Sequence, residues 1–411
     1  MASWQDRRLW ALFANTAYAL SSFVLGYLLL LQGNHQQYGA FAFYLLLQAF
    51  GYSLVNALFG APLLIASRDG TNQPAGLNPM LRLAGLLALC SAALQAFLLW
   101  QQGVNSEVIA MLAASALFMQ LRWFCRCIQQ NDAPEQVMLA DLSFSLVALV
   151  GAAVLWQLEL VSLWSFSLLL LSAAVISLLP AGRLLWVVLR AQPDWRLWSD
   201  GFAMQGKPAL AGVVTVEITA NIHQYLIVLV QGAAALAPVA AAGLFLRPMA
   251  LVQTSLSQIE RPRLARAVAA TDWRELQHVW RSFLAWSVRA FLLNLLVVLL
   301  LLWLAPAWLW PDVSSLAHFI ACGGFVAAAA LLRSLRGPAS TLLQAMDQFR
   351  FLASVTWRAS LLTVPLVLIG LYTGGILGAL LAMLLGECAV ALPILRRCRQ
   401  MLEAETGQCK E

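Results

Sequence analysis

Residues 225–276 read YLIVLVQGAAALAPVAAAGLFLRPMALVQTSLSQIERPRLARAVAATDWREL. Two apolar runs in this stretch are separated by VQGAAALA, which contains no Lys or Arg, and the second run is followed by a segment rich in Arg. A span needs roughly 20 apolar residues to cross the hydrocarbon of a bilayer. The stretch therefore predicts the end of one membrane span, a complete second span, and a connector on the basic, cytoplasmic side.

The same alternation extends over the whole chain. Basic connectors, such as the segment from Arg261 to Arg281 and the group Arg333, Arg336 and Arg350, alternate with connectors that lack Lys and Arg, such as LQGNHQQYG and YTGGI. This is the positive-inside pattern, and it places both termini in the cytoplasm. We expect an all-α polytopic membrane protein with about twelve spans. The predicted spans are 9–31, 40–67, 80–101, 107–126, 137–157, 162–189, 207–230, 237–258, 284–306, 315–337, 351–373 and 376–396.

The composition agrees with this class. Hydrophobic residues make up 61% and charged residues 11% of the 411 residues, whereas soluble domains carry about 25% charged residues. The formal charge of +6 comes from the cytoplasmic connectors, so it favours contact with anionic membrane lipids and does not indicate nucleic acid. Cys125 and Cys127 have no second pair of ligands beside them in the sequence. We therefore expect no metal site, and no cofactor is predicted.

The two halves of the chain resemble each other. Span 1 ends LLLLQG at 28–33, and span 7 ends IVLVQG at 227–232. Six spans in each half is an even number, so both halves enter the membrane in the same orientation and form parallel repeats. The sequence predicts a six-helix N-terminal lobe at 1–190, a cytoplasmic linker at 191–206 and a six-helix C-terminal lobe at 207–411.

Ionisable residues within the spans are candidates for a functional site, because charges are costly in a bilayer. Arginine suits a phosphate, since its planar fork donates two parallel hydrogen bonds. We therefore predict that Arg247, Arg289 and Arg358 bind an anionic head group. Arg122 and Lys207, near the inner mouth, are reserve candidates for the same role.

Depth along the spans also indicates pairs of opposite charge. Three pairs lie at similar depth: Glu217 with Arg247, Arg358 with Glu387, and Asp141 with Arg122. Two interpretations stay open. Either each pair is structural, or an arginine is paired while the protein is empty and turns to a phosphate when substrate arrives.

Span 7 has the densest group of polar residues. Glu217, Asn221 and Gln224 are spaced i, i+4, i+7 and share one helix face. A polar stripe in the membrane must face protein or water, so it lines a cavity or forms hydrogen bonds between helices. Glu217 in a desolvated cavity is our candidate for proton coupling. The set assigned to coupling or a polar cavity is Glu217, Asn221, His223, Gln224, Asn15, Asp141 and Glu387.

Several enzymatic classes are disfavoured by what the sequence lacks. The first outer connector, QGNHQQYG, has no carboxylate for a membrane glycosyltransferase, and every outer connector is too short for a separate domain. No GxxxxGK[ST] phosphate loop is present. We therefore predict no catalytic residue and expect a transporter, not an enzyme.

Three further stretches carry a family resemblance together with the run at 225–276. They are Tyr38-Gly39-Ala40-Phe41 after span 1, LLQAMDQFRFLASVTWRAS at 342–360, and GGILGALLAMLLGECAV at 374–390. These stretches resemble polysaccharide flippases of the Wzx type, which belong to the multidrug/oligosaccharidyl-lipid/polysaccharide exporter superfamily. The resemblance covers nearly the whole chain.

The resemblance implies two six-helix lobes around a cationic cavity. It implies that undecaprenyl-diphosphate-linked oligosaccharide is moved by alternating access across a bacterial inner membrane, with a polysaccharide polymerase or a chain-length regulator as partners. A transporter of the major facilitator type also has two parallel halves, but the loop IASRDGTNQPAGLNPMLR matches only part of that class's signature. A drug exporter of the same superfamily is the other alternative.

Overall fold

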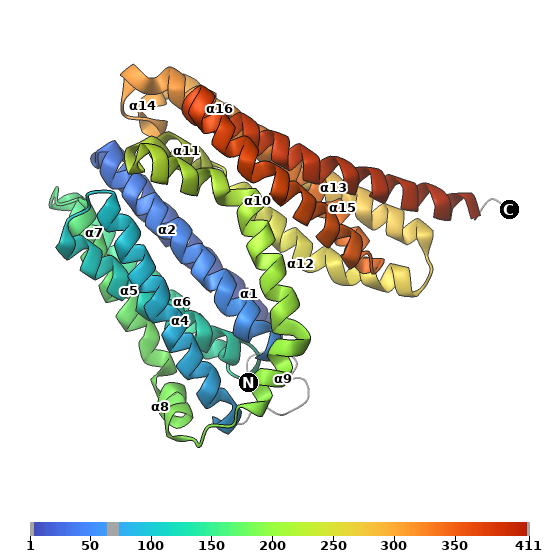
Figure 1. The fold of residues 1–411 in the computed structure, drawn as a ribbon, viewed down its shortest axis with the longest axis horizontal. Helices are drawn as coiled ribbons and strands as arrows, with labels where there is room; N and C mark the ends of the chain where they lie inside the picture. Colours follow the sequence, from blue (N-terminus) through green and yellow to red (C-terminus); the bar gives the residue numbers. More distant parts are fainter. Residues whose placement is uncertain (1–3, 64–73, 409–411) are drawn as a thin grey trace. The chain divides into compact units, whose positions relative to one another are not determined.

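The computed structural model describes the backbone of residues 4–63 and 74–408, and every regular element in these ranges is helical (Figure 1). Helices are expected here because each backbone polar group in the hydrocarbon must be satisfied within its own segment. The predicted all-α class is confirmed. The chain forms two compact units, residues 1–214 with 232–234 and residues 215–231 with 235–411. The exact lobe limits at 190 and 207 stay a prediction.

The first unit is a bundle in which α1 packs on α6, α4 packs on α5, and α5 and α6 both pack on α7. Its elements in chain order are α1 (Trp4–Gln32), α2 (His35–Val55), the π-helical turn η1 (Asn56–Gly60), α4 (Pro74–Gln101), α5 (Ser106–Asp132), α6 (Pro134–Gln157), α7 (Leu163–Leu178), the 3-10 turn η2 (Leu179–Ala181), α8 (Gly182–Arg190), α9 (Arg196–Gly201) and the π-helical turn η3 (Phe202–Gly206).

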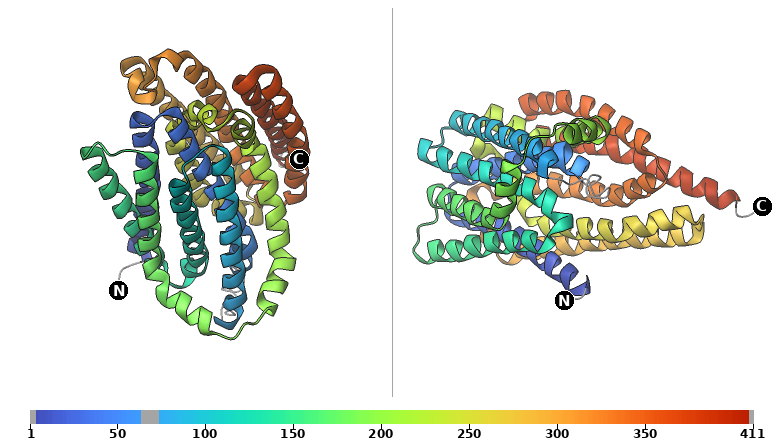
Figure 2. Two further views of the ribbon diagram at one scale, coloured as in Figure 1. Left: turned by 60° about the vertical axis from the view of Figure 1, so that its left-hand side comes forward. Right: turned by 90° about the horizontal axis from the view of Figure 1, so that it is seen from below.

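The second unit holds most of the remaining helices, and α12, α13, α15 and α16 lie side by side in it (Figure 2). Its elements in chain order are α10 (Lys207–Gln231), α11 (Ala233–Phe245), α12 (Arg247–Ala269), α13 (Trp273–Leu304), α14 (Pro306–Leu309), the 3-10 turn η4 (Val313–Ser315), α15 (Leu316–Ala345) and α16 (Phe349–Gln408). Asp272 caps the start of α13, because its carboxylate accepts a hydrogen bond from the Glu275 backbone N–H at 3.0 Å.

The long element α16 consists of two antiparallel arms. Gly375 has a φ of 58° and a non-helical ψ, a conformation that glycine adopts readily because it has no Cβ. A Cβ on Gly370 or on Gly378 would overlap the backbone of the other residue. The two arms therefore touch beside the turn, and they correspond to predicted spans 11 and 12.

Nine helices within the described ranges are long and apolar enough to cross a membrane, or ten if the bent pair α11–α12 counts as one span. The apolar part of α1, Thr16–Gln32, is a shorter apolar helix that coincides with most of predicted span 1. When the two arms of α16 are counted separately, the helices correspond to the twelve predicted spans. The chain is a multi-pass membrane protein.

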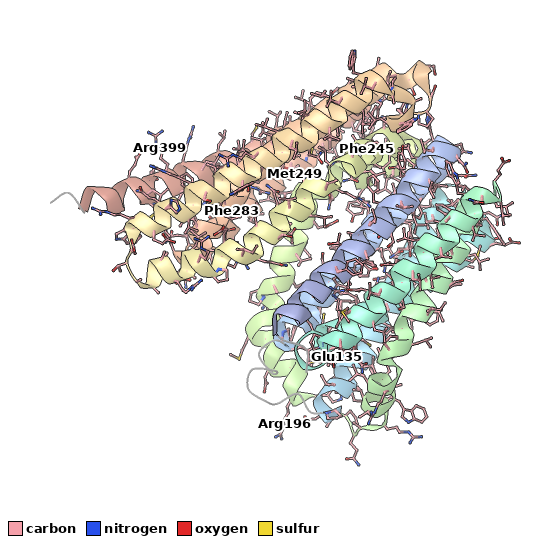
Figure 3. All side chains as sticks on the ribbon, turned by 180° about the vertical axis from the view of Figure 1, so that it is seen from behind. Glu135, Arg196, Phe245, Met249, Phe283 and Arg399 are labelled. Carbon is pink, nitrogen blue, oxygen red and sulfur yellow. The ribbon has the colours of Figure 1, made fainter. Side chains whose placement is uncertain are left out.

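Predicted span 8 is broken near its middle. α11 ends at Phe245 and α12 begins at Arg247, with a bend of 50° between them. Pro248 follows the break and has no backbone N–H to donate. Asn294 of α13 donates its side-chain amide to the Phe245 carbonyl at 3.1 Å. Figure 3 labels Phe245 and Met249 on either side of the break. Discontinuous membrane helices often contribute to transporter binding sites.

Candidate functional site

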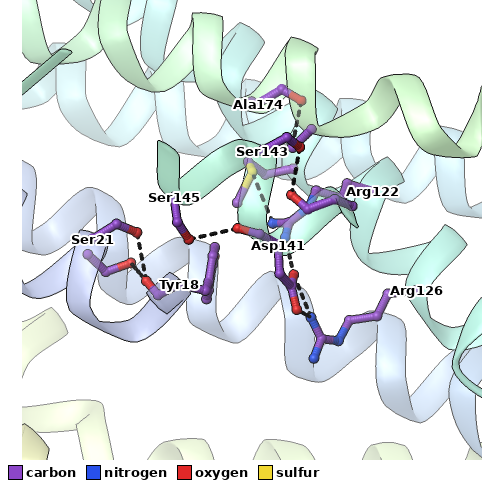
Figure 4. A network of polar contacts seen from close by, with 12 residues as sticks. Tyr18, Ser21, Arg122, Arg126, Asp141, Ser143, Ser145 and Ala174 are labelled. Carbon is purple, nitrogen blue, oxygen red and sulfur yellow. Dashed lines mark hydrogen bonds and ion pairs between the residues drawn. The ribbon is translucent and has the colours of Figure 1, made fainter. Parts of the chain in front are cut away.

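A first cluster of buried charges joins α5 and α6 in the first unit (Figure 4). Asp141 of α6 accepts hydrogen bonds from Arg122 and Arg126 of α5, and Arg126 reaches its two carboxylate oxygens at 2.8 and 2.6 Å. The side chains of Arg122 and Asp141 are only 5% and 2% exposed. The predicted match of Asp141 with Arg122 is confirmed as an ion pair. We call Arg122, Arg126 and Asp141 the N-terminal charge cluster.

Aromatic rings pack against this cluster. The Arg122 guanidinium carbon lies 5.0 Å from the ring centre of Tyr18 and 5.4 Å from that of Phe144. The two ring centres are 5.1 Å apart. Desolvated cation–π contacts of this kind contribute about 1–2 kcal/mol. The cluster also lines a small pocket between α5, α6 and α7, yet its carboxylate stays almost fully covered.

A second cluster joins α15 and α16 in the second unit. The Oε1 atom of Glu387 accepts a hydrogen bond from Arg333 Nε at 2.6 Å, and its Oε2 lies 3.6 Å from a terminal nitrogen of Arg336. Glu387 is 2% exposed, whereas the side chains of Arg333 and Arg336 are 37% and 25% exposed. We call Arg333, Arg336 and Glu387 the C-terminal charge cluster. Two guanidinium groups share one carboxylate, so the cluster keeps an excess positive charge.

The structure corrects two sequence interpretations at this cluster. The predicted pairing of Glu387 with Arg358 is wrong, because Glu387 binds Arg333 and Arg336 while Arg358 is exposed elsewhere on α16. The grouping of Arg333 and Arg336 with a basic connector is also wrong. α15 continues through Pro338 to Ala345, since proline is tolerated in membrane helices whose neighbours satisfy the freed backbone groups.

Helix geometry places Glu387 about halfway along its span, whereas Arg333 and Arg336 lie about 26 Å and about 30 Å from Leu316 at the start of α15. At about 1.5 Å per residue, Glu387 lies about 18 Å from Gly375 at the turn of α16. The carbonyl of Ala220, which accepts from Arg333 at 3.3 Å, lies about 17 Å from the end of α10. A hydrocarbon core is about 30 Å thick, and an unneutralised arginine near its centre costs about 3 kcal/mol on insertion scales.

α10 has a buried polar face beside this cluster. Thr215, Thr219 and His223 recur every four residues and are buried. The Nδ1 atom of His223 is covered and makes no hydrogen bond within the part of the chain that is described. Arg333 interacts electrostatically with His223 and donates to the neighbouring Ala220 carbonyl. The C-terminal charge cluster thus borders a polar helix face.

A second polar face of α10 carries the predicted stripe of Glu217, Asn221 and Gln224. These three residues are half-buried. The Tyr225 hydroxyl donates to Glu217 at 2.6 Å, and the Gln224 amide donates to Asn221 at 3.3 Å. The stripe is therefore hydrogen-bonded along its own helix. Its role in coupling stays a prediction.

The other predicted site residues lie apart from the two clusters. Arg247 is the first residue of α12 and is half-buried, and Lys207 is the exposed first residue of α10. Arg289 of α13 is exposed, with its guanidinium carbon 5.4 Å from the ring centre of Trp286. Asn15 belongs to α1, and its side chain lies outside the described residues. Head-group binding by these arginines and Lys207 stays a prediction.

Sequence reasoning missed Arg333 and Arg336 as site residues. The available signal was that both arginines fall within the predicted span at 315–337, although they were also counted with a basic connector. A basic pair within such a span marks an intramembrane site.

Comparison with known proteins gives a match in fold but not in sequence. No family model matches the chain, and no curated protein matches its sequence. An inward-facing multidrug resistance MATE transporter of the MOP superfamily has a TM-score of 0.72 and 14% identity, covering 95% of this chain and 96% of that one. The lipid II flippase MurJ in an inward closed conformation has a TM-score of 0.68 and 12% identity, with coverage of 96% and 87%. The eukaryotic MATE transporter AtDTX14 has a TM-score of 0.62 and 10% identity, with coverage of 98% and 99%.

These similarities extend over nearly the full length of every protein compared. They show that the chain has the twelve-helix, two-lobe fold of these transporters. The structural neighbours are transporters and a flippase, and the first of them is described as a member of the MOP superfamily, which the sequence resemblance also indicates. At this level of identity the fold is shared, while the substrate must be argued from the residues of this chain.

Proposed function

We propose that this protein flips lipid-linked oligosaccharides with a diphosphate head group across a bacterial inner membrane by alternating access. The observation that carries the proposal is the excess positive charge of the C-terminal charge cluster. Arg333 and Arg336 are both partly exposed beside one buried carboxylate. Two guanidinium groups in reach of each other suit a diphosphate, which offers several oxygens for bidentate hydrogen bonds.

Two further lines support the same substrate class. The sequence resembles Wzx-type polysaccharide flippases over nearly its whole length. The fold also matches that of a protein described as a lipid II flippase. By the same resemblance, a polysaccharide polymerase or a chain-length regulator is the proposed partner, and undecaprenyl diphosphate is the proposed lipid carrier.

Drug export is the second candidate, because other structural neighbours are multidrug transporters. Glu217 favours it, since this carboxylate is half-buried and accepts a hydrogen bond from the neutral hydroxyl of Tyr225. An organic cation would bind such a carboxylate. Asp141 and Glu387 each already pair with two arginines, so neither carboxylate is open to an organic cation. These two residues therefore favour the flippase.

The test is translocation by the full-length protein in proteoliposomes. The probe is a fluorescent oligosaccharide on a short polyprenyl diphosphate, and its arrival in the outer leaflet is read by access to an external glycosidase. We expect the wild type to move this probe. We expect it not to move the same sugar when that sugar is attached to a phosphate-free prenyl chain. Arg333→Gln should reduce the rate to that of empty vesicles, because the diphosphate loses a donor that lies within the membrane.

Arg399→Gln is the matched control, because Arg399 is an exposed arginine in an i,i+4 pair with Glu403 at the far end of α16. Figure 3 labels it near the C-terminus. This control should translocate like wild type. Equal rates for the diphosphate and phosphate-free probes would refute the flippase. Uptake of an organic cation that is lost in Glu217→Gln would establish the drug exporter instead.

A further inference from the structure

The polar stripe of α10 lies beside the C-terminal charge cluster. Arg333 donates a hydrogen bond to the Ala220 carbonyl at 3.3 Å. In an α-helix a carbonyl is directed at the backbone N–H four residues later, which here belongs to Gln224. Asn221 directly follows Ala220 and shares a helix face with Gln224, because the two are spaced i, i+3. The Arg333 guanidinium therefore lies beside the turn that carries both amide side chains.

Asn221 and Gln224 use only part of their hydrogen-bonding capacity within the protein. Among the described residues, the side-chain hydrogen bond of this pair runs from Gln224 Nε2 to Asn221 Oδ1 at 3.3 Å. Each side-chain amide has two N–H donors and an oxygen with two lone pairs. The Asn221 Nδ2 group and the Gln224 Oε1 atom thus keep donors and an acceptor for a ligand. Both residues are half-buried, so a ligand can reach them.

The chemistry of the two amides suits a neutral ligand that carries hydroxyl groups. A hydroxyl both donates and accepts hydrogen bonds, so adjacent hydroxyls match the mixed donors and acceptor of this pair. A prenyl chain has no hydrogen-bonding group, and the positive charge of an organic cation has no lone pair for an amide N–H. Neutral amides also form no ion pair with Arg333, so they do not compete with a phosphate for its guanidinium.

We propose that Asn221 and Gln224 form a sugar subsite, which binds neighbouring hydroxyl groups of the first sugar on a diphosphate held by Arg333. Gln224 lies about 6 Å along the helix axis from Ala220, a distance that a sugar attached directly to that diphosphate spans. One hydroxyl accepts from Asn221 Nδ2, and its neighbour donates to Gln224 Oε1. The pair therefore selects a sugar over an apolar group of the same size.

This inference rests on the proposed function, because it takes a diphosphate-linked sugar as the ligand. Its test is calorimetric titration of the purified full-length protein with two probes. One is glucose joined to farnesyl diphosphate, and the other has a cyclohexyl group in place of glucose. The probes share the prenyl chain and the charge of the diphosphate and differ in the hydroxyls. We expect the wild type to bind the glucose probe about tenfold more tightly.

The double variant Asn221→Leu, Gln224→Met keeps the side-chain volumes and removes both amides. It should bind the two probes equally, with wild-type affinity for the cyclohexyl probe. Gln231→Met is the matched control, because it removes an exposed amide at the end of the same helix, and it should keep the tenfold preference. If the double variant does not elute as a folded protein, each single variant should still show a reduced preference.

The ratio of the two affinities separates this inference from the proposed function. Arg333→Gln should weaken binding of both probes by the same factor, since it removes a contact to the diphosphate that they share. Equal binding of both probes by the wild type would contradict the sugar subsite and leave the diphosphate site standing. A tenfold preference that persists in the double variant would overturn the assignment to Asn221 and Gln224. Absence of binding of either probe by the wild type would contradict both proposals.

Discussion

The two charge clusters have the same composition and different surroundings. Each places two arginines from the fourth span of its half, α5 or α15, around one carboxylate that is 2% exposed. In the N-terminal charge cluster Arg126 reaches both carboxylate oxygens, and aromatic rings cover Arg122. In the C-terminal charge cluster one carboxylate oxygen has no hydrogen bond among the described residues, and both arginines are partly exposed.

The difference teaches how one chemical motif can serve two purposes. A buried ion pair whose two carboxylate oxygens are both hydrogen-bonded resists change, because removal of either partner leaves an uncompensated charge. A pair with an open arginine and an unsatisfied oxygen can exchange partners at a lower cost. We therefore interpret the N-terminal charge cluster as structural and the C-terminal charge cluster as the substrate site.

The largest expected effect is on stability at the N-terminal charge cluster. Asp141→Asn should lower the free energy of unfolding by about 3–5 kcal/mol, since it leaves the buried Arg122 and the partly buried Arg126 without their counter-charge. Thermal unfolding in detergent, followed by loss of monodisperse elution, measures this loss. A variant as stable as wild type would remove the structural role from this cluster.

The corresponding change in the C-terminal charge cluster should be milder. Glu387→Gln should cost less than Asp141→Asn, because Arg333 and Arg336 are 37% and 25% exposed, whereas Arg122 and Arg126 are 5% and 20% exposed. The same unfolding measurement applies. If this loss equals or exceeds that of Asp141→Asn, the two clusters do not differ in the way we describe.

Arg333→Lys tests whether the geometry of the guanidinium matters beyond its charge. Lysine keeps the charge but cannot form the planar bidentate contact. We expect about tenfold weaker binding of farnesyl diphosphate, which corresponds to about 1.4 kcal/mol. Arg399→Lys, at the exposed pair with Glu403, should leave the affinity unchanged. Equal binding by Arg333→Lys and wild type would show that a point charge is sufficient.

The smallest expected effect comes from the aromatic cover of the N-terminal charge cluster. Tyr18→Leu removes one cation–π contact to Arg122 and should cost about 1 kcal/mol. Translocation should stay at the wild-type rate once the amount of folded protein is matched. A strong transport defect with unchanged stability would place Tyr18 in the transport path. The N-terminal charge cluster would then not be purely structural.

Much of the fold is predictable from the sequence, because the bilayer restricts the options of the chain. The apolar runs and the Lys- and Arg-free connectors give the spans, and the turn at Gly375 lies within the predicted connector YTGGI. The Asp141–Arg122 pair is also predictable, since the two residues lie at similar depth in consecutive spans. Contacts between consecutive spans follow from the order of the chain.

The C-terminal charge cluster was not predictable in the same way. Glu387 follows Arg358 in the next arm of α16, so consecutive order suggested that they pair. Its partners instead come from α15, which packs against α16. Side-chain packing between helices decides this choice, and neither depth nor spacing contains that information. Arg333 and Arg336 were also counted with the basic connector, although both fall within the predicted span at 315–337.

The central claim is that substrate phosphate binds the C-terminal charge cluster and leaves the N-terminal one intact. The most direct test is an experimental structure of the full-length protein bound to a polyprenyl-diphosphate-linked sugar. We predict phosphate oxygens within hydrogen-bond distance of Arg333, with Arg333 turned from Glu387 and the Asp141–Arg122 pair unchanged. A diphosphate bound at Arg122 and Arg126, with the Arg333–Glu387 bond intact, would contradict the account.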